Sequence, residues 1–242
     1  MELLNSKNKP LIQKRHNMSS WKTDLKNALQ LPLPGLTAQN KMAPSSRQTA
    51  DVSNLNLPPI QSSVLILLHH SKEGITIPFI QRPLYDGPHS GQISLPGGKQ
   101  ENIDKNNWET ALRETREELG IETGDIEFLG ELTQLYIPHS NFYVSPQVGY
   151  IHKKLKFNPC PFEVSEIIEA SAYDLLTQNY KTKNINNRGV NIEAPYYEIK
   201  DKHIWGATAM VISELIEIFN TRAPYWANAL RSYNDHISPK SP

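Results

Sequence analysis

The sequence predicts an α/β domain, an α/β/α sandwich built on a mixed β-sheet, and three observations lead to that prediction. Apolar and alternating segments typical of strands recur from Ser62 onward. A glycine turn, Pro96-Gly97-Gly98, is followed by a segment with helical periodicity. A second helical pattern, Ala207 to Phe219, closes the region. Strands combined with helices in this order suit helices packed on a sheet.

The strands are predicted from short runs rich in Val, Ile, Leu and aromatic residues, separated by turn residues. Gly74, for example, lies in the turn between the first two runs. The predicted strands are Ser63 to His69, Ile75 to Gln81, Phe128 to Leu135 and Val144 to Ile151, with a short one at Gln92 to Leu95 and a late hairpin of Tyr196 to Ile199 and His203 to Trp205 around Lys200-Asp201-Lys202.

The helix after the glycine turn has clear signals at both ends. Asn106 is a candidate N-cap, and Glu109 stands in the capping-box position. Gly120 follows the last periodic residue, where a left-handed C-cap requires no side chain. The residues expected to face the core are Trp108, Leu112, Thr115 and Leu119.

The chain divides into an N-terminal extension (1–61), an α/β domain (62–222) and a C-terminal tail (223–242). The extension is rich in Asn, Ser, Gln and Pro, and Trp21 to Leu31 is predicted to form a short amphipathic helix that Leu33-Pro34-Gly35 ends. We interpret it as an ordered arm, folded over the core or around a second copy in a homodimer, with a disordered start. For Met1 to Ser20 a floppy leader is the equal alternative.

Composition excludes several classes of protein. Lys and Arg together number 25, as do Asp and Glu, so the charge balance gives no support for nucleic-acid binding. No apolar run is long enough to span a bilayer, and Met1 to Asn17 lacks the apolar core of a signal peptide. Cys160 is the single cysteine, which excludes an intrachain disulfide and fits a reducing compartment. We expect a cytoplasmic protein.

Three carboxylates are concentrated on one face of the predicted helix. Glu114, Glu117 and Glu118 stand at positions i, i+3 and i+4, where side chains are neighbours. Like charges at this spacing repel, so a cation between them would relieve the repulsion. Carboxylate oxygens suit Mg²⁺ or Mn²⁺ better than Zn²⁺. On the helix alone, a solvated acidic face is the better interpretation, and the glycine turn upstream shifts the balance toward a metal site.

These residues resemble the signature of the Nudix hydrolase family. The signature begins with a glycine, here Gly98, and its second half is matched by Arg113, Glu114, Glu117, Glu118, Gly120 and Ile121. The acid of the first half is Asp104 instead of Glu, one extra residue precedes Arg113, and Thr115 stands at a usually apolar position. The resemblance implies the sandwich fold, a divalent metal held by the three glutamates with the Gly98 carbonyl, and hydrolysis of a pyrophosphate. Arg113 is an i, i+4 partner of Glu117 and is expected to hold it in place.

The extra residue and the Asp are similar to the coenzyme A pyrophosphatase branch of this family. The similarity continues upstream in Arg82, His89-Ser90-Gly91-Gln92 and Pro96-Gly97-Gly98, and downstream in short segments as far as Ala209. One departure concerns the substrate: Asp86-Gly87 stands where that branch has Leu-Arg. A lost Arg removes a cation suited to phosphate recognition. Coenzyme A carries a 3′-phosphate, so its assignment as substrate is weakened.

Other polar residues are candidates for the same site. Glu163 matches a Glu-Val pair of the branch and is favoured over Glu166 and Glu169 as an additional acid, although a surface role is nearly as good an interpretation. Arg82, His89, Gln92 and Lys99 are candidate substrate-binding residues. His69-His70 is not interpreted as a metal pair, because neighbours in a strand point to opposite faces.

The predicted reaction is attack of water on one phosphorus of a pyrophosphate, with Glu114 or Glu163 assisting removal of its proton. Three function classes follow. The first is hydrolysis of coenzyme A or its derivatives. The second is hydrolysis of ADP-ribose, NADH or dinucleoside polyphosphates. The third is a non-catalytic ligand-sensing module, which the intact set of metal carboxylates disfavours.

Overall fold

The computed structural model describes residues 20–47, 57–72, 74–86, 89–187 and 190–222. Within these ranges one large sheet contains β1 (Ile60–Ser71), β2 (Gly74–Gln81), β3 (Ile93–Ser94), β4 (Gly97–Lys99), β5 (Glu127–Glu131), β6 (Leu135–Ile137), β7 (Phe142–Lys154) and β8 (Glu166–Ser171). The strand order is β3-β2-β1-β7-β5, with β4 beside β1, β6 beside β7 and β8 beside β2. Because β1 and β7 are parallel and the other pairs antiparallel, the sheet is mixed, as predicted.

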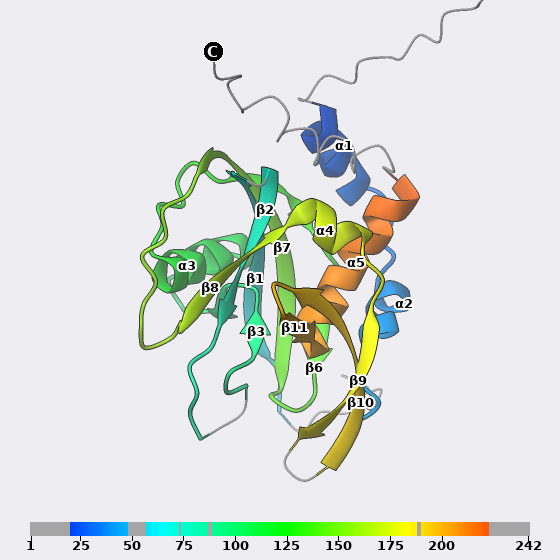
Figure 1. Ribbon diagram of the computed structural model, residues 1–242. Helices are drawn as coiled ribbons and strands as arrows, with labels where there is room; N and C mark the ends of the chain where they lie inside the picture. The colour runs from blue at the N-terminus through cyan, green and yellow to red at the C-terminus, as the bar shows by residue number, and fades with distance from the viewer. Residues whose placement is uncertain (1–19, 48–56, 73, 87–88, 188–189, 223–242) are drawn as a thin grey trace, which may run out of the picture.

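Helices cover both faces of this sheet (Figure 1). Side chains alternate along β1, so Leu65 and Leu67 join one apolar cluster while Ile66 and Leu68 join the other. The first cluster contains residues of α3 (Asn107–Leu119), and the second contains residues of α1 (Ser20–Leu29) and α5 (Gly206–Arg222). The predicted α/β/α sandwich is therefore confirmed.

A second, three-stranded sheet stands beside α5. It consists of β9 (Lys181–Asn187), β10 (Val190–Ile199) and β11 (Lys202–Trp205), and it follows the short helix α4 (Ala172–Thr177). The predicted hairpin is confirmed, with Lys200 and Asp201 at positive φ in its turn. Neither β8, α4 nor β9 was predicted. In β9 the sequence Lys-Thr-Lys-Asn-Ile-Asn-Asn carries no apolar alternation that would mark a strand.

Part of the N-terminal extension folds over the core. Helix α1 covers most of the predicted helical segment but ends at Leu29, because Pro32 disfavours helical conformation at the residue before it. Trp21 and Leu25 are buried against the sheet. The chain continues through α2 (Leu36–Gln39) and a 3-10 turn, η1 (Asn40–Met42). Of the predicted start, Met1 to Ser20, all but Ser20 lies outside the described residues, as does the predicted tail (223–242).

One predicted strand, Phe128 to Leu135, is wrong as a continuous element. The structure divides it into β5 and β6, with a register shift between Phe128 and Gly130. The division has a tertiary cause, since both the backbone N–H and the hydroxyl of Thr133 donate to the Glu214 carboxylate on α5. Because the Thr133 N–H donates to a side chain of α5, it is not available for a hydrogen bond between strands, and the strand is interrupted there.

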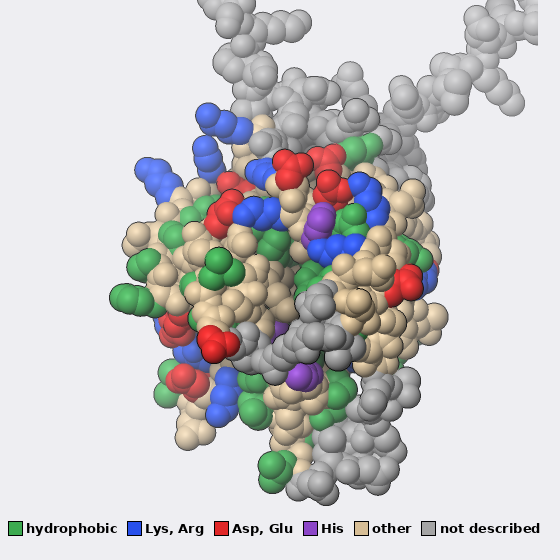
Figure 2. Space-filling view, turned by 60° about the horizontal axis from the view of Figure 1, so that its bottom comes forward, with side chains coloured by type: hydrophobic (Ala, Val, Ile, Leu, Met, Phe, Trp, Pro, Cys, Tyr) green, Lys and Arg blue, Asp and Glu red, His purple; other side chains and the backbone are tan. Residues whose placement is uncertain are grey.

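The outer surface agrees with the balanced charge of the chain. On the face seen in Figure 2, acidic and basic side chains intermingle. Among the described residues no helix has the length and apolar character needed to cross a membrane.

Candidate active site

Helix α3 begins and ends where its sequence predicts. The Asn106 side chain accepts the Glu109 N–H at 2.9 Å, and Gly120 ends the helix at φ 62. The second half of the predicted capping box differs, because the Glu109 carboxylate accepts the N–H of Lys105, one residue before the N-cap. Thr115, Leu119 and Ala111 are fully buried, whereas Trp108 and Leu112 are only partly so. The opposite face of α3 carries the acids.

Of the predicted glycine turn, Gly97 and Gly98 lie in strand β4, which pairs with β1 and brings its backbone into contact with that acidic face. At Gly98 a Cβ atom would lie 2.4 Å from the Glu114 carboxyl carbon. At Gly97, where φ is 154, it would lie 2.3 Å from the Ser63 carbonyl oxygen of β1. At Gly97 the neighbour is backbone that cannot move aside, so glycine permits the close approach of β4 to β1. At Gly98 the neighbour is the end of the Glu114 side chain, so a larger residue would displace that carboxylate.

Two of the three glutamates converge on this turn. The Glu118 side chain is only 4% exposed and accepts the Gly97 N–H at 2.8 Å. Burial, with the nearby charges of Glu114 and Glu163, raises the pKa of Glu118 to about 8. The pKa of Glu114 is also raised, chiefly by burial, and is lowered in part by Arg113. Each of these carboxylates makes ionisation of its neighbour less favourable. A divalent cation bound between them would offset this repulsion and accept their oxygens as ligands, so these residues fit such an ion.

The third glutamate is more exposed than the other two. Glu117 is half-exposed, and its carboxylate accepts from Arg113 Nη1 at 2.9 Å, which confirms the predicted i, i+4 pair. In the described part of the chain, no group of three or more His, Cys, Asp or Glu side chains is placed to hold a metal ion. The carboxylates of Glu114 and Glu117 both contact Arg113 Nη1, at 3.0 and 2.9 Å, so this guanidinium holds the two acids beside each other.

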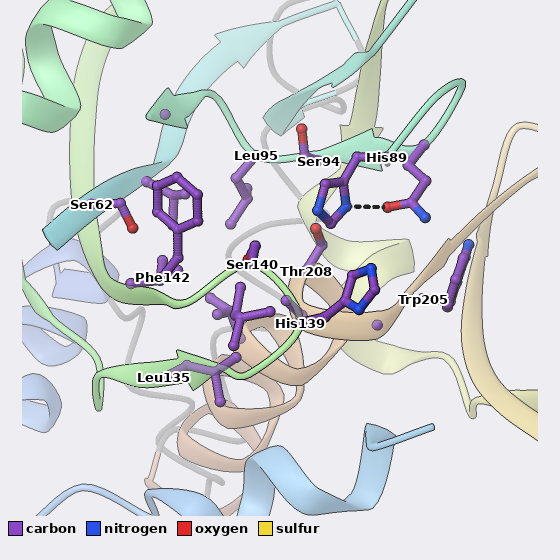
Figure 3. A pocket seen from close by; sticks show the side chains of 18 of the residues that line it. Ser62, His89, Ser94, Leu95, Leu135, His139, Ser140, Phe142, Trp205 and Thr208 are labelled. Atoms are coloured by element: carbon purple, nitrogen blue, oxygen red, sulfur yellow. Dashed lines mark hydrogen bonds between the residues drawn. The ribbon is translucent and has the colours of Figure 1, made fainter. Parts of the chain in front are cut away.

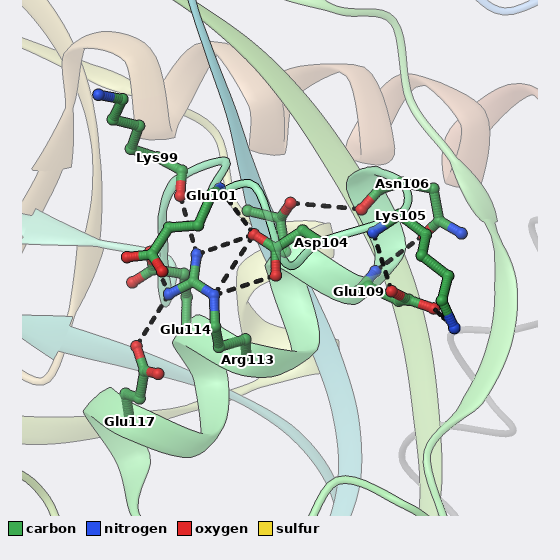
Figure 4. A network of polar contacts seen from close by, with 10 residues as sticks. Lys99, Glu101, Asp104, Lys105, Asn106, Glu109, Arg113, Glu114 and Glu117 are labelled. Carbon is green, nitrogen blue, oxygen red and sulfur yellow. Dashed lines mark hydrogen bonds and ion pairs between the residues drawn. The ribbon is translucent and has the colours of Figure 1, made fainter.

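Arg113 is the centre of a polar network that joins α3 to the loop before it (Figure 4). Its guanidinium binds the Asp104 carboxylate through Nε at 3.1 Å and Nη2 at 3.0 Å, and Nη2 also donates to the Lys99 carbonyl at 2.8 Å. A further contact of 3.0 Å joins Nη1 to Glu114. Arg113 is 8% exposed, and the Asp104 side chain is 3% exposed. The hydrogen bonds from Arg113 lower the pKa of Asp104, so this buried pair is charged and ties the glycine turn to α3.

The additional acids have different surroundings. Glu163 is exposed and raises the pKa of both Glu114 and Glu118 by its charge, so it faces the same region. Glu166 instead pairs with Lys202, and Glu169 lies 3.1 Å from His69 Nε2. The last contact places His69 in a structural pair, in keeping with the sequence-based interpretation.

A cavity of about 1030 Å³ adjoins the glycine turn on the side of the sheet facing α5 (Figure 3). All four predicted substrate-binding residues line it: Arg82, His89, Gln92 and Lys99. Gly97 and Gly98 line it as well. His89 has a positive φ of 64, and its Nδ1 lies 2.9 Å from Gln92 Oε1. The Arg82 Nε is buried and has no hydrogen-bond partner within the described residues.

Several cavity residues were not predicted from the sequence. Phe142 and Trp205 provide aromatic surface, His139 lies in the loop between β6 and β7, and Arg47 comes from the N-terminal extension. Phe142, His139 and Arg47 belong to no local motif, so only the tertiary fold identifies them. Trp205 begins the last segment that resembles the coenzyme A branch, although no binding role was predicted for it. Of the departure Asp86-Gly87, Asp86 is exposed, and Gly87 lies outside the described residues.

Comparison with known proteins gives consistent matches. The family model for the NUDIX domain matches residues 59–179. An uncharacterized Nudix hydrolase NudL of Yersinia enterocolitica is 35% identical over 133 residues, 54% of this chain and 68% of that protein. Nudix hydrolase 15, mitochondrial, of Arabidopsis thaliana is 30% identical over 174 residues, 69% of this chain and 61% of that protein.

Solved structures resemble the chain more distantly. A MutT protein from Methanosarcina mazei aligns with a TM-score of 0.46 and 18% identity, covering 69% of this chain and 99% of that chain. A MutT/nudix family protein from Enterococcus faecalis aligns with a TM-score of 0.45 and 16% identity, covering 84% of this chain and 75% of that chain.

Proposed function

Because the chain belongs to the Nudix hydrolase family, we propose that it is a metal-dependent pyrophosphohydrolase whose substrate is coenzyme A or a coenzyme A derivative. The expected products from coenzyme A are 4′-phosphopantetheine and adenosine 3′,5′-bisphosphate. Family membership supports the reaction on nucleoside diphosphate derivatives. The choice of coenzyme A depends on the cavity and on the residues that line it.

One observation carries this proposal. Residues that resemble the coenzyme A branch, Arg82, His89 and Gln92, line one cavity together with Gly97 and Gly98, whose strand packs against the acidic helix. Arg82 and Lys99 supply cations for a pyrophosphate, and His89 and Gln92 are joined to each other at its rim. A cavity of this volume is large enough for a nucleotide.

The residues of α3 have distinct roles in the proposed reaction. Glu114 and Glu118, with the Gly98 carbonyl and Glu117, would hold Mg²⁺ or Mn²⁺. A divalent ion bound there would polarise phosphoryl oxygens and lower the pKa of a bound water. Arg113 and Asp104 fix the glycine turn against α3, as their buried ion pair indicates. Glu114 or Glu163 would accept the proton of the attacking water.

A second candidate is hydrolysis of a nucleoside diphosphate derivative that lacks a third phosphate, such as ADP-ribose, NADH or a dinucleoside polyphosphate. It is favoured by Asp86, an exposed acid in the loop that ends at His89. An acid at this position repels a phosphate, whereas the coenzyme A branch has a cation in the adjoining position. A ligand-sensing module without turnover is the third possibility.

A hydrolysis screen tests the proposal. The purified protein is incubated with Mg²⁺ or Mn²⁺ and with coenzyme A, acyl-coenzyme A, ADP-ribose, NADH or diadenosine polyphosphates, and the products are identified by mass. We expect the highest kcat/KM with coenzyme A or an acyl derivative. Preference for ADP-ribose, NADH or a dinucleotide would replace coenzyme A as the substrate, and no turnover on any compound would favour the sensing module.

A further inference from the structure

The N-terminal extension contributes a cationic side chain to the cavity. Arg47 lies just after η1, and the segment that carries it is fixed at several points. The Ser45 N–H donates to the Glu193 carbonyl of β10 at 2.8 Å, and the Glu193 N–H donates back to Ser45 Oγ at 3.0 Å. The Arg47 N–H donates to the Pro44 carbonyl at 2.8 Å. Arg47 is thus held in a defined position on the wall of the cavity.

The Arg47 guanidinium has more N–H donors than its contacts with the described residues use. Its Nη2 donates to the Tyr136 carbonyl at 2.7 Å, whereas a guanidinium has five N–H donors. No carboxylate of the described residues lies within ion-pair distance of it. Burial lowers its pKa with no acid to offset the effect. A half-buried cation that lines a cavity and has no anionic partner among the described residues is suited to an anionic ligand.

The strand register shows how far this cation is from the glycine turn. Lys99 on β4 pairs with Ser62 on β1, and Ser62 pairs with Val144 on β7. Val144 in turn pairs with Leu135 on β6, which adjoins Tyr136. Three strand spacings of about 4.8 Å place β6 roughly 14 Å across the sheet from β4. Arg47, whose guanidinium binds the Tyr136 carbonyl, is therefore anchored away from the position proposed for the scissile pyrophosphate.

We propose that Arg47 binds a phosphate monoester on the substrate that is distinct from the scissile pyrophosphate, the ribose phosphate of coenzyme A. This assignment rests on the proposed function and deepens it. The loop before His89 lacks the cation of the coenzyme A branch, with Asp86-Gly87 in its place. Arg47 supplies a replacement from a segment outside that loop. The N-terminal extension thereby takes part in substrate selection as well as in packing.

The test compares substrates and products that differ only in this phosphate. Steady-state kinetics are measured with coenzyme A and with 3′-dephospho-coenzyme A, using the full chain and its Arg47→Gln variant. We expect the variant to raise KM for coenzyme A about 10- to 100-fold, the range of a charge-assisted hydrogen bond, with little change in kcat. KM for the dephosphorylated compound should stay the same. Arg47→Lys keeps the positive charge but lacks the paired N–H donors of the guanidinium, so its KM for coenzyme A should lie between those of the wild type and Arg47→Gln.

A binding measurement separates this inference from the proposed function. Calorimetry without metal compares adenosine 3′,5′-bisphosphate, adenosine 2′,5′-bisphosphate and AMP, so that it also identifies which ribose phosphate is bound. We expect the wild-type protein to prefer the 3′,5′-bisphosphate to AMP, and Arg47→Gln to lose that preference. If the screen shows no coenzyme A hydrolysis but the preference persists, the proposed function fails and the phosphate site stands.

The control is Lys41→Gln, because Lys41 lies on the same arm but pairs with Glu217 on the exposed side of α5. This variant should behave as the wild type in both assays. Equal effects of Arg47→Gln on coenzyme A and its dephosphorylated form, or no effect on either, would overturn the assignment. Should Arg47→Gln fold poorly, the wild-type protein still decides the matter, because equal affinity for AMP and both bisphosphates would exclude the site.

Discussion

Two buried glutamates, one on each helical layer, have opposite surroundings. Glu214 on α5 is 0% exposed and accepts four hydrogen bonds, from the Gly35 N–H, Gln39 Nε2, the Thr133 N–H and Thr133 Oγ1, at distances of 2.6 to 3.1 Å. Glu118 on α3 is nearly as buried, accepts the Gly97 N–H, and lies close enough to Glu114 for their charges to repel.

The difference separates a structural carboxylate from one placed for a ligand. Four donors replace the water that Glu214 loses on folding, so its charge is stabilised by the protein itself. Glu118 has lost its water with far less compensation, and the nearby acids increase the cost. Such a group costs stability unless a cation binds beside it. Burial alone does not distinguish the two positions, whereas the number of donors does.

The largest expected effect concerns Glu118 and turnover. Glu118→Gln should reduce metal-dependent kcat by about 10²- to 10³-fold, the range seen when one preorganised charge-stabilising group is lost. The amide oxygen can still accept the Gly97 N–H, so the metal-free variant should melt at the same temperature as the wild type or higher. Kinetics and thermal melts measure both quantities. Glu122→Gln, an exposed site just after α3, is the matched control and should leave both unchanged.

If Glu118→Gln kept full turnover and lowered the stability of the protein, the distinction between Glu118 and Glu214 would be contradicted. That result would place Glu118 in the same structural class as Glu214, and the metal assignment on α3 would have to be abandoned.

The next effect concerns Glu214 and stability. Glu214→Ala leaves buried donors of the N-terminal arm and of Thr133 without an acceptor, which should cost about 3 kcal/mol of unfolding free energy. Denaturant melts measure it. Glu217→Ala, one turn further along α5, removes only an exposed pair with Lys41 and should cost less than about 1 kcal/mol. Equal costs for the two variants would contradict the structural role of Glu214.

The same contrast explains what the sequence could and could not predict. The caps of α3 and the Arg113–Glu117 pair depend on residues close together along one helix, so local patterns predict them. Asp104 was identified by its position in a motif, but its buried pair with Arg113 depends on the path of the intervening loop. Local patterns cannot show how such a loop folds back on the helix.

Contacts between segments that are distant along the chain could not be predicted from the sequence either, because they too depend on how the chain folds back on itself. Thr133 reaches Glu214 across 81 residues, and this contact divides the predicted strand Phe128 to Leu135. Arg47 reaches the Tyr136 carbonyl across 89 residues. Nothing in the composition of either segment marks its partner, because such contacts are selected by the three-dimensional packing of the whole domain.

The smallest expected effect is the pH dependence of stability in the metal-free protein. The pKa of Glu118 is raised from 4.5 to about 8 by folding, so between these pH values the folded state holds a proton that the unfolded state has released. Stability is therefore highest below pH 4.5 for this group and is lost as pH rises toward 8, the reverse of an ion-paired carboxylate. We expect a loss of about 2 kcal/mol from Glu118, less than the full shift implies because relaxation and water entry screen a buried charge.

Denaturant melts from pH 5 to pH 8, with and without Mg²⁺, measure this slope. Metal should flatten it, because a bound cation favours the ionised carboxylate in the folded state. Glu118→Gln should flatten it without metal, whereas Glu214→Gln should lower stability and leave the slope in place. If the slope survived in Glu118→Gln, the titrating group would be another acid of the site, and Glu114, whose pKa is also raised by burial, would be the next to replace.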